Sequence, residues 1–174
     1  ALSGIVQTTK AAGTTSTFAV APATTATLQL SNSAALSGLS ATGTNVITFN
    51  NTGTTIQYSG AAQTVYTSAA ITGLPSGVSY YSIAFSGTGI TTASGSNLNV
   101  AGNFTNSMAN DASNYVNLSS PTVIFNGTTQ TLAGGSGNGT TFYNVTFSGN
   151  GTKTMSSGVF NIASTGILTM SGTS

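Results

Sequence analysis

Apolar residues that lie two positions apart recur along the chain and predict short β-strands. The clearest pairs are Ile47/Phe49, Ile56/Tyr58, Ile83/Phe85, Leu98/Val100, Val123/Phe125, Val145/Phe147, Phe160/Ile162 and Leu168/Met170. Alternate side chains of a strand point to opposite faces, so each pair places two apolar groups on one face. The segments between the pairs are rich in Gly, Ser, Asn and Thr, which favour turns. No segment shows the 3.6-residue period of an amphipathic helix over three turns, so we expect an all-β chain.

The individual strands expected from this alternation are short. They cover residues 27–30, 45–49, 55–58, 82–85, 97–100, 115–118, 122–125, 144–147, 159–162 and 168–170.

Two longer patterns each occur twice. TIQYSGAAQTV at 55–65 is answered by TVIFNGTTQTL at 122–132, and YYSIAFSGTG at 80–89 by FYNVTFSGNG at 142–151. The copies share Gly60/Gly127, Gln63/Gln130, Tyr81/Tyr143, Phe85/Phe147 and Gly87/Gly149. Repeats of this kind indicate units that stack on one another. We therefore expect one continuous structural domain, with irregular N-terminal coils or an exchanged strand in 1–54, a first copy in 55–121 and a second, possibly truncated copy in 122–174.

The repeat and the short strands favour a β-solenoid, or parallel β-helix, that forms a segment of a longer fibre. Each copy divides into about three coils of roughly 20 residues, with apolar side chains inside and Ser, Thr and Asn outside. The alternative is a β-sandwich filament subunit. In that case a strand near residues 5–6 or 18–20 would complete the sheet of the next subunit.

Charged side chains are almost absent, and this limits the chemistry. Lys10, Lys153 and Asp111 are the only ones in 174 residues, and the chain has no Arg, Glu, His, Cys or Trp. General acid–base catalysis and metal binding need clustered titratable groups, so we expect no enzyme, no cofactor and no metal site. Two lysines cannot neutralise many phosphates, which argues against nucleic-acid binding. No apolar run reaches the roughly 20 residues of a membrane span, so none is expected.

Exposed aromatic residues are the candidate binding groups. Tyr80–Tyr81 and Phe142–Tyr143 occupy matched positions in the two copies. Strand alternation buries one member of each pair, which leaves Tyr81 and Tyr143 as the expected exposed residues. A tyrosine ring offers flat apolar area with a polar edge and could stack on a sugar.

Asparagine and threonine form two further patterns. Asn-X-Ser/Thr sequons begin at Asn50, Asn103, Asn117, Asn126, Asn138, Asn144 and Asn150, although a chain of this composition generates sequons by chance. Thr-X-Thr pairs such as Thr25/Thr27 and Thr152/Thr154 could order water in an ice-binding array. Their irregular spacing argues against this.

Residues 55–174 resemble the repeat region of giant cell-surface adhesins of Bacteroidota. The resemblance is carried by TVIFNGTTQTL, by TFYNVTFSGNGTKTMSSGVFNIASTGILTMSGT and by YYSIAFSGTGITTASGSNLNVAGNF. Proteins of this family are exported by the type IX secretion system and include gliding-motility adhesins. The motifs consist of turn glycines and core aromatics, so the resemblance implies architecture and carries over no catalytic residue.

These observations together predict a non-catalytic structural segment of an extracellular fibre or adhesin at the cell surface. Its partners would be neighbouring repeats or subunits of its own kind, and surface polysaccharide. The alternatives are a self-assembling, pilus-like filament subunit with donor-strand exchange, and a module that binds polysaccharide or ice.

Overall fold

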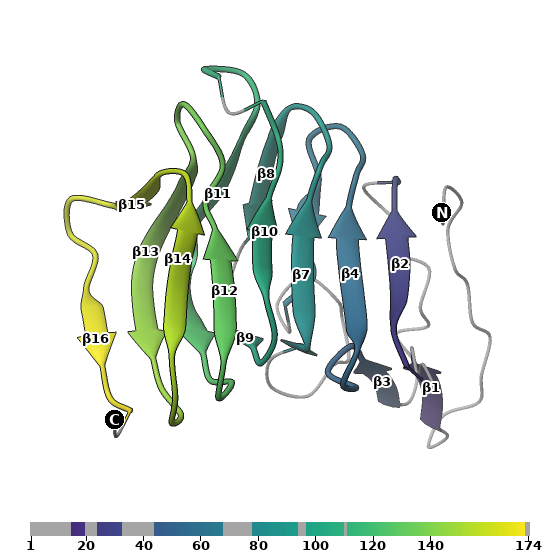
Figure 1. The fold of residues 1–174 in the computed structure, drawn as a ribbon. Coiled ribbons are helices and arrows are strands. Elements are labelled where there is room, and N and C mark those ends of the chain that lie inside the picture. The colour runs from purple at the N-terminus through teal and green to yellow at the C-terminus, as the bar shows by residue number, and fades with distance from the viewer. Residues whose placement is uncertain are drawn as a thin grey trace.

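The computed structural model describes residues 15–19, 24–32, 44–67, 78–93, 97–109 and 111–172, and these form a stack of parallel β-strands without a helix. The chain winds through about five turns of a β-solenoid, as the side-by-side arrows of Figure 1 show. The strand pairing defines three sides, which the chain visits in a fixed order. The predicted solenoid is therefore confirmed. No helix that could cross a membrane occurs among the described residues.

The first side is a six-stranded sheet. It contains β2 (Ala26–Leu30), β4 (Thr54–Tyr58), β7 (Ser82–Phe85), β10 (Phe104–Asn106), β12 (Gln130–Ala133) and β14 (Lys153–Ser157). The second side contains β5 (Thr64–Val65), β8 (Ile90–Ala93), the first parts of β11 (Tyr115–Phe125) and β13 (Thr140–Phe147), and β15 (Phe160–Ile162).

The third side contains β1 (Thr15–Ala19), β3 (Thr44–Thr48), β6 (Ser79–Tyr80), β9 (Leu98–Val100), the last parts of β11 and β13, and β16 (Leu168–Met170). An isolated bridge between Phe49 and Tyr80 connects β3 with β6. The register advances by 31 residues at this bridge and by only 20 between Ser79 and Asn99, so turns of unequal length share one core.

Aromatic side chains stack through the core because the parallel register places equivalent residues above one another. Tyr58 lies on Phe85 with ring centroids 5.8 Å apart, and Phe125 lies on Phe147 at 5.4 Å. Phe104 contacts both Phe85 and Phe125 and so links the first side to the third. All five of these residues are buried, and aromatic contacts of this kind add about 1 kcal/mol each beyond the area that they bury.

A short corner motif ends many of the strands. An inward aromatic or methionine is followed by Ser or Asn and then by Gly, at residues 58–60, 85–87, 125–127, 147–149 and 170–172. The N–H of the middle residue donates to the carbonyl of the preceding coil at 2.9–3.0 Å, in the pairs Ser59–Leu30, Ser86–Tyr58, Asn126–Val100, Ser148–Phe125 and Ser171–Phe147. The hydrogen-bond ladder therefore continues through the corner, where the chain changes direction.

Gln63 and Gln130 brace two of these corners in the same way. The Gln130 Oε1 accepts from the N–H of Gly127 at 3.0 Å, and its Nε2 donates to the carbonyls of Val100 and Gly102 in the preceding coil. Gln63 makes the matching bonds to Gly60, Leu30 and Asn32. Both side chains are buried, so the repeated Gly-x-x-Gln of the sequence is a structural brace.

The two sequence copies lie on different sides of the solenoid. Residues 55–58 belong to β4 on the first side, whereas 122–125 belong to β11 on the third. Residues 82–85 and 144–147 differ in the same way. The copies are therefore not separated by a whole number of turns. β11 runs without a break across residues 121 and 122, where the second copy was expected to begin.

The β-sandwich alternative is overturned by the parallel pairing. β1 pairs with β3 of its own chain, with Phe18 opposite Ile47, so residues 18–19 are not donated to another subunit. The other candidate donor strand, at residues 5–6, lies outside the described residues. Most expected strands are found within one or two residues of their expected bounds. The structure adds β1, β5, β6, β8, β10, β12 and β14 and extends β13 to Thr140.

Replacing Gln130 with leucine is expected to lower the free energy of unfolding by about 2–3 kcal/mol, because the Gly127 N–H and the Gly102 carbonyl would lose their partner. Urea unfolding followed by circular dichroism measures the change. Gln57→Leu is the matched control, since Gln57 is half-exposed and its side-chain amide donates to the hydroxyl of Ser86. We expect a loss of about 0.5 kcal/mol or less for the control. Equal losses in the two variants would contradict the bracing role.

Candidate binding face

A row of neutral polar side chains lies on the outward register of the first side, one from each strand or from the residue just before it. All of them are at least partly exposed except Ser82, which is buried. Thr27 lies opposite Thr55, which lies opposite Ser82, and Thr131 lies opposite Thr154. Asn103 joins the two parts, because its N–H donates to the Ser82 Oγ and its Oδ1 accepts from the N–H of Thr131. We call this row the polar ladder: Thr27, Thr55, Ser82, Asn103, Thr131 and Thr154.

A groove of about 390 Å³ opens beside the N-terminal half of the polar ladder. It is lined by Thr25, Ala26, Thr27, Gly53, Thr55, Tyr81, Ser82 and Asn103. The lining offers hydroxyl and amide groups and one aromatic ring, and none of these residues is charged. We call it the Tyr81 groove.

Tyr81 is held firmly at the edge of this groove. It lies between β6 and β7 and is half-exposed. Its N–H donates to the carbonyl of Phe49 at 2.8 Å, and its own carbonyl accepts from the N–H of Gly102 at 2.5 Å. A Cβ atom at position 102 would lie 3.0 Å from the Tyr81 Cδ1, so the glycine leaves room for the ring to lie against the next coil. The backbone of Tyr81 is therefore held between two coils, and its ring lies close to Gly102.

Tyr143 is half-exposed as well but lies elsewhere. It occurs within β13, where this strand passes from the second side to the third, and Gly166 of the next coil approaches its carbonyl. The structure thus does not bring the two expected aromatics together, and only Tyr81 lines the groove.

The described charged residues stabilise the backbone. Asp111 is fully exposed, and its carboxylate accepts from the N–H of Ser113 and from the N–H and side-chain amide of Asn114. These hydrogen bonds hold the pKa of Asp111 below its ordinary value, with the Ser113 N–H as the largest contribution. The Nζ of Lys153 donates to the carbonyl of Gly127. Lys10 lies outside the described residues, and within the described ranges no cluster of metal-binding side chains occurs.

The Thr-X-Thr pairs do not form a two-row array on the first side. Thr27, Thr131 and Thr154 belong to the polar ladder, but Thr54 is buried. The neighbouring outward row consists of Gln29, Gln57, Ala84, Thr105 and Ala133. A regular lattice of threonine hydroxyls and methyls, as expected for ice binding, is therefore not present on this sheet.

Most sequons lie on exposed turns. Asn50, Asn103, Asn126, Asn138 and Asn150 are exposed, whereas Asn117 and Asn144 are half-buried within strands. The Asn144 Oδ1 accepts from the N–H of Ile167 at 3.0 Å, as the Ser82 Oγ does from Asn103. Several of these asparagines therefore form hydrogen bonds that stabilise the stacked coils, whether or not they are glycosylated.

The sequence did not predict that the other groove residues share one site with Tyr81. Thr25, Gly53, Ser82 and Asn103 are separated by up to 78 positions, and only the strand register brings them together. The only signal for these residues in the sequence was the strand alternation, which places the neighbours of an inward apolar residue on the outer face. No protein-family model matches the chain, and no curated protein or solved structure matches it.

Proposed function

We propose that this chain is a non-catalytic structural segment of an extracellular fibre or adhesin, and that it binds neutral polysaccharide at the Tyr81 groove. The observation that carries the proposal is the composition of the groove, where hydroxyl and amide groups surround a fixed tyrosine ring without any charge. The resemblance to Bacteroidota surface adhesins supports the cell-surface location.

The chemistry of the groove suits an uncharged sugar. Sugar hydroxyls donate and accept hydrogen bonds as Thr and Asn side chains do, and the C–H face of a pyranose ring packs against an aromatic face. Acidic glycans and nucleic acids need cationic partners, which the groove lacks.

The polar ladder extends this contact beyond the groove. Its members follow one another at the strand spacing of about 4.8 Å, so a polysaccharide lying along the solenoid axis would meet a hydroxyl or amide on every coil of the ladder except that of Ser82, which is buried. Each contact is weak, and affinity would come from their number. This explains why a surface without a deep pocket suits adhesion.

Tyr81→Ala is expected to weaken binding about fivefold, because the ring contact contributes about 1 kcal/mol. An array of neutral and acidic glycans first identifies the best neutral ligand, and titration calorimetry then compares the variants. Tyr143→Ala is the matched control, since this tyrosine is also half-exposed but lies outside the groove. Binding to acidic glycans alone, or equal losses in the two variants, would overturn the proposal.

A further inference from the structure

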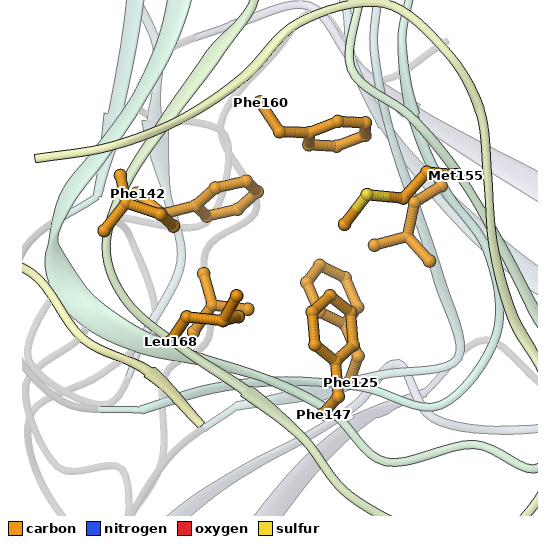
Figure 2. A pocket seen from close by; sticks show the side chains of 9 residues that line it. Phe125, Phe142, Phe147, Met155, Phe160 and Leu168 are labelled. Atoms are coloured by element: carbon orange, nitrogen blue, oxygen red, sulfur yellow. The ribbon is translucent and has the colours of Figure 1, made fainter. Parts of the chain in front are cut away.

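The inward side chains of the solenoid and the Tyr81 groove offer different chemistry. Figure 2 shows inward side chains that surround one space: Phe125, Phe142, Phe147, Met155, Phe160 and Leu168. This hollow of about 150 Å³ is lined by apolar side chains. The Tyr81 groove is lined mainly by polar residues. We therefore expect selection between ligands by hydrogen bonds at the groove, and the orientation of its polar groups decides what is selected.

The side-chain amide of Asn103 has an orientation that its hydrogen bonds determine. One of its two polar atoms lies 2.9 Å from the N–H of Thr131 in the following coil. A backbone N–H can only donate, so this atom is the oxygen and the other is the NH₂ group. The backbone of Asn103 is held by the preceding coil, because its N–H donates to the Ser82 Oγ and its carbonyl accepts from the N–H of Ile83, both at 3.0 Å. Asn103 is thus held from both neighbouring coils.

The NH₂ group of Asn103 is available to a ligand. Asn103 is exposed, and its Nδ2 has no hydrogen-bond partner in the part of the chain that the structure describes. Its Oδ1 is directed to the following coil, whereas every other residue that lines the groove comes earlier in the chain. Asn103 therefore presents a donor to the groove, and its acceptor is already occupied.

The other polar side chains of the groove do not select between donors and acceptors. They are hydroxyls, from Thr25, Thr27, Thr55, Tyr81 and Ser82. A hydroxyl donates or accepts as its partner requires, whereas the NH₂ of an amide can only donate. The ligand atom in front of Asn103 must therefore be an acceptor. The carbonyl oxygen of an acetamido group, which accepts and never donates, fits this position.

The Tyr81 ring lies beside this donor and suits the rest of an acetamido group. A Cβ atom on Gly102, the residue before Asn103, would lie 3.0 Å from the Tyr81 Cδ1. The Asn103 N–H also bonds to Ser82, which follows Tyr81 in the chain. An acetamido group carries a methyl group next to its carbonyl. The carbonyl can accept from Asn103 while the methyl group packs against the aromatic ring.

We propose that Asn103 determines the specificity of the Tyr81 groove, and that the groove selects neutral sugars that carry an acetamido group. The Asn103 amide donates to the acetamido carbonyl. This inference rests on the proposed function, because it names the class of polysaccharide that binds at the same site. Acidic sugars also offer acceptor oxygens, but none of the residues that line the groove carries a positive charge to pair with them.

Two oligosaccharides that differ in this one group test the selection with the wild-type protein. Short chitin fragments carry an acetamido group where cellulose fragments of the same length and linkage carry a hydroxyl. Titration calorimetry is expected to show about tenfold tighter binding of the chitin fragment, since only its carbonyl and methyl group match the donor and the ring. Equal affinities, or tighter binding of the cellulose fragment, would overturn the inference.

The same measurements separate this inference from the proposed function. If another neutral glycan without an acetamido group binds more tightly than the chitin fragment and Tyr81→Ala weakens its binding, the inference fails and the proposed function stands. If no neutral glycan binds, both fail.

Asn103→Asp tests the residue itself. Aspartate keeps an oxygen for the Thr131 N–H but presents a second, charged oxygen to the groove. Binding of the chitin fragment is expected to weaken at least about tenfold, because two acceptors then face each other, whereas a cellulose hydroxyl can still donate to the carboxylate. Asn138→Asp is the matched control, since this exposed asparagine lies outside the groove and gains the same charge. The control should keep the wild-type preference.

An unchanged preference in Asn103→Asp would overturn the role of Asn103. Circular dichroism checks that the variant is folded. If it is not, the comparison of the two oligosaccharides with the wild-type protein still decides the selection, because that comparison needs no substitution.

Discussion

Gly127→Ala is expected to lower the free energy of unfolding by about 4 kcal/mol, or to prevent folding altogether. A Cβ atom at this position would overlap the carbonyl oxygen of Ala101 in the preceding coil and would lie 3.0 Å from the Cγ of Gln130. Neither neighbour can move freely, because the Gln130 side chain donates hydrogen bonds to the carbonyls of Val100 and Gly102, on either side of Ala101. Overpacking of a rigid backbone contact is among the more destabilising single changes.

Urea unfolding of Gly127→Ala and of a control variant measures this cost. Thr128→Ala is a suitable control, because residue 128 is the exposed neighbour in the same turn and should change stability by about 0.5 kcal/mol or less. The φ angle of Gly127 is not in the left-handed region, so backbone strain does not contribute. A loss below about 1 kcal/mol would show that the corner can spread, and the close stacking of coils would then not explain the glycine.

Raising the pH above about 10 is expected to unfold the protein steeply, through Tyr58 and Tyr80. The two phenols are buried, and their hydroxyl oxygens lie 2.7 Å apart. Tyr80 donates to the carbonyl of Tyr66, and Tyr58 accepts from the Tyr66 N–H, so the Tyr58 hydroxyl is left to donate to Tyr80. Burial raises the pKa of both groups above the ordinary value, and the proximity of each phenol to the other raises the pKa of Tyr80 further.

The sign follows from linkage. A raised pKa in the folded state means that the unfolded chain loses its protons first, so this stability is fully present below pH 10 and is lost as the pH rises from there towards the folded-state values. Each tyrosine contributes about 1.4 kcal/mol per pH unit, and the pair about 2.7 kcal/mol. Urea midpoints from pH 8 to 12 measure the slope.

Tyr58→Phe isolates one of the two groups. The variant should be less stable at pH 8, because Tyr80 loses its hydrogen bond to the Tyr58 hydroxyl. Above pH 10, the loss of unfolding free energy per pH unit should fall to about half. If stability does not depend on pH up to 12, the buried pair is not the group that titrates.

The fold class followed from the sequence because the core alternates strictly. Pairs such as Val123/Phe125 point inward as expected, and their spacing identifies the strands that carry them. Several of the missed strands whose side chains the structure describes carry polar or single inward residues. In β10, Asn106 occupies a core position, where its amide donates to the carbonyls of Gly134 and Gly139. A rule that looks for two apolar residues cannot find such a strand, since its buried polar group is satisfied only by distant parts of the chain.

The residues that line the Tyr81 groove could be predicted only in part, for a similar reason. Alternation was enough to place Tyr81 at the surface, and matched position in the copies suggested Tyr143 as its equivalent. Their equivalence is local, because a glycine of the next coil lies against the backbone carbonyl of each tyrosine. A residue lies on one side of the solenoid or another according to the number of corners that precede it. This number cannot be counted from the sequence, because the turns vary in length from 20 to 31 residues.

The same Gly-x-x-Gln corner occurs at two different edges of the solenoid, and this affects how such a chain can lengthen by gene duplication. Gly60 with Gln63 closes the edge after the first side, and Gly127 with Gln130 closes the edge after the third, with the same bonds to the coil beneath. A copied gene segment therefore need not encode complete turns to be accommodated. It can join the stack rotated by one side and still find partners for its corner amides and a place for its aromatic residues. Genes of this type can thus change length in small steps, and each step moves the surface residues to a new side of the rod.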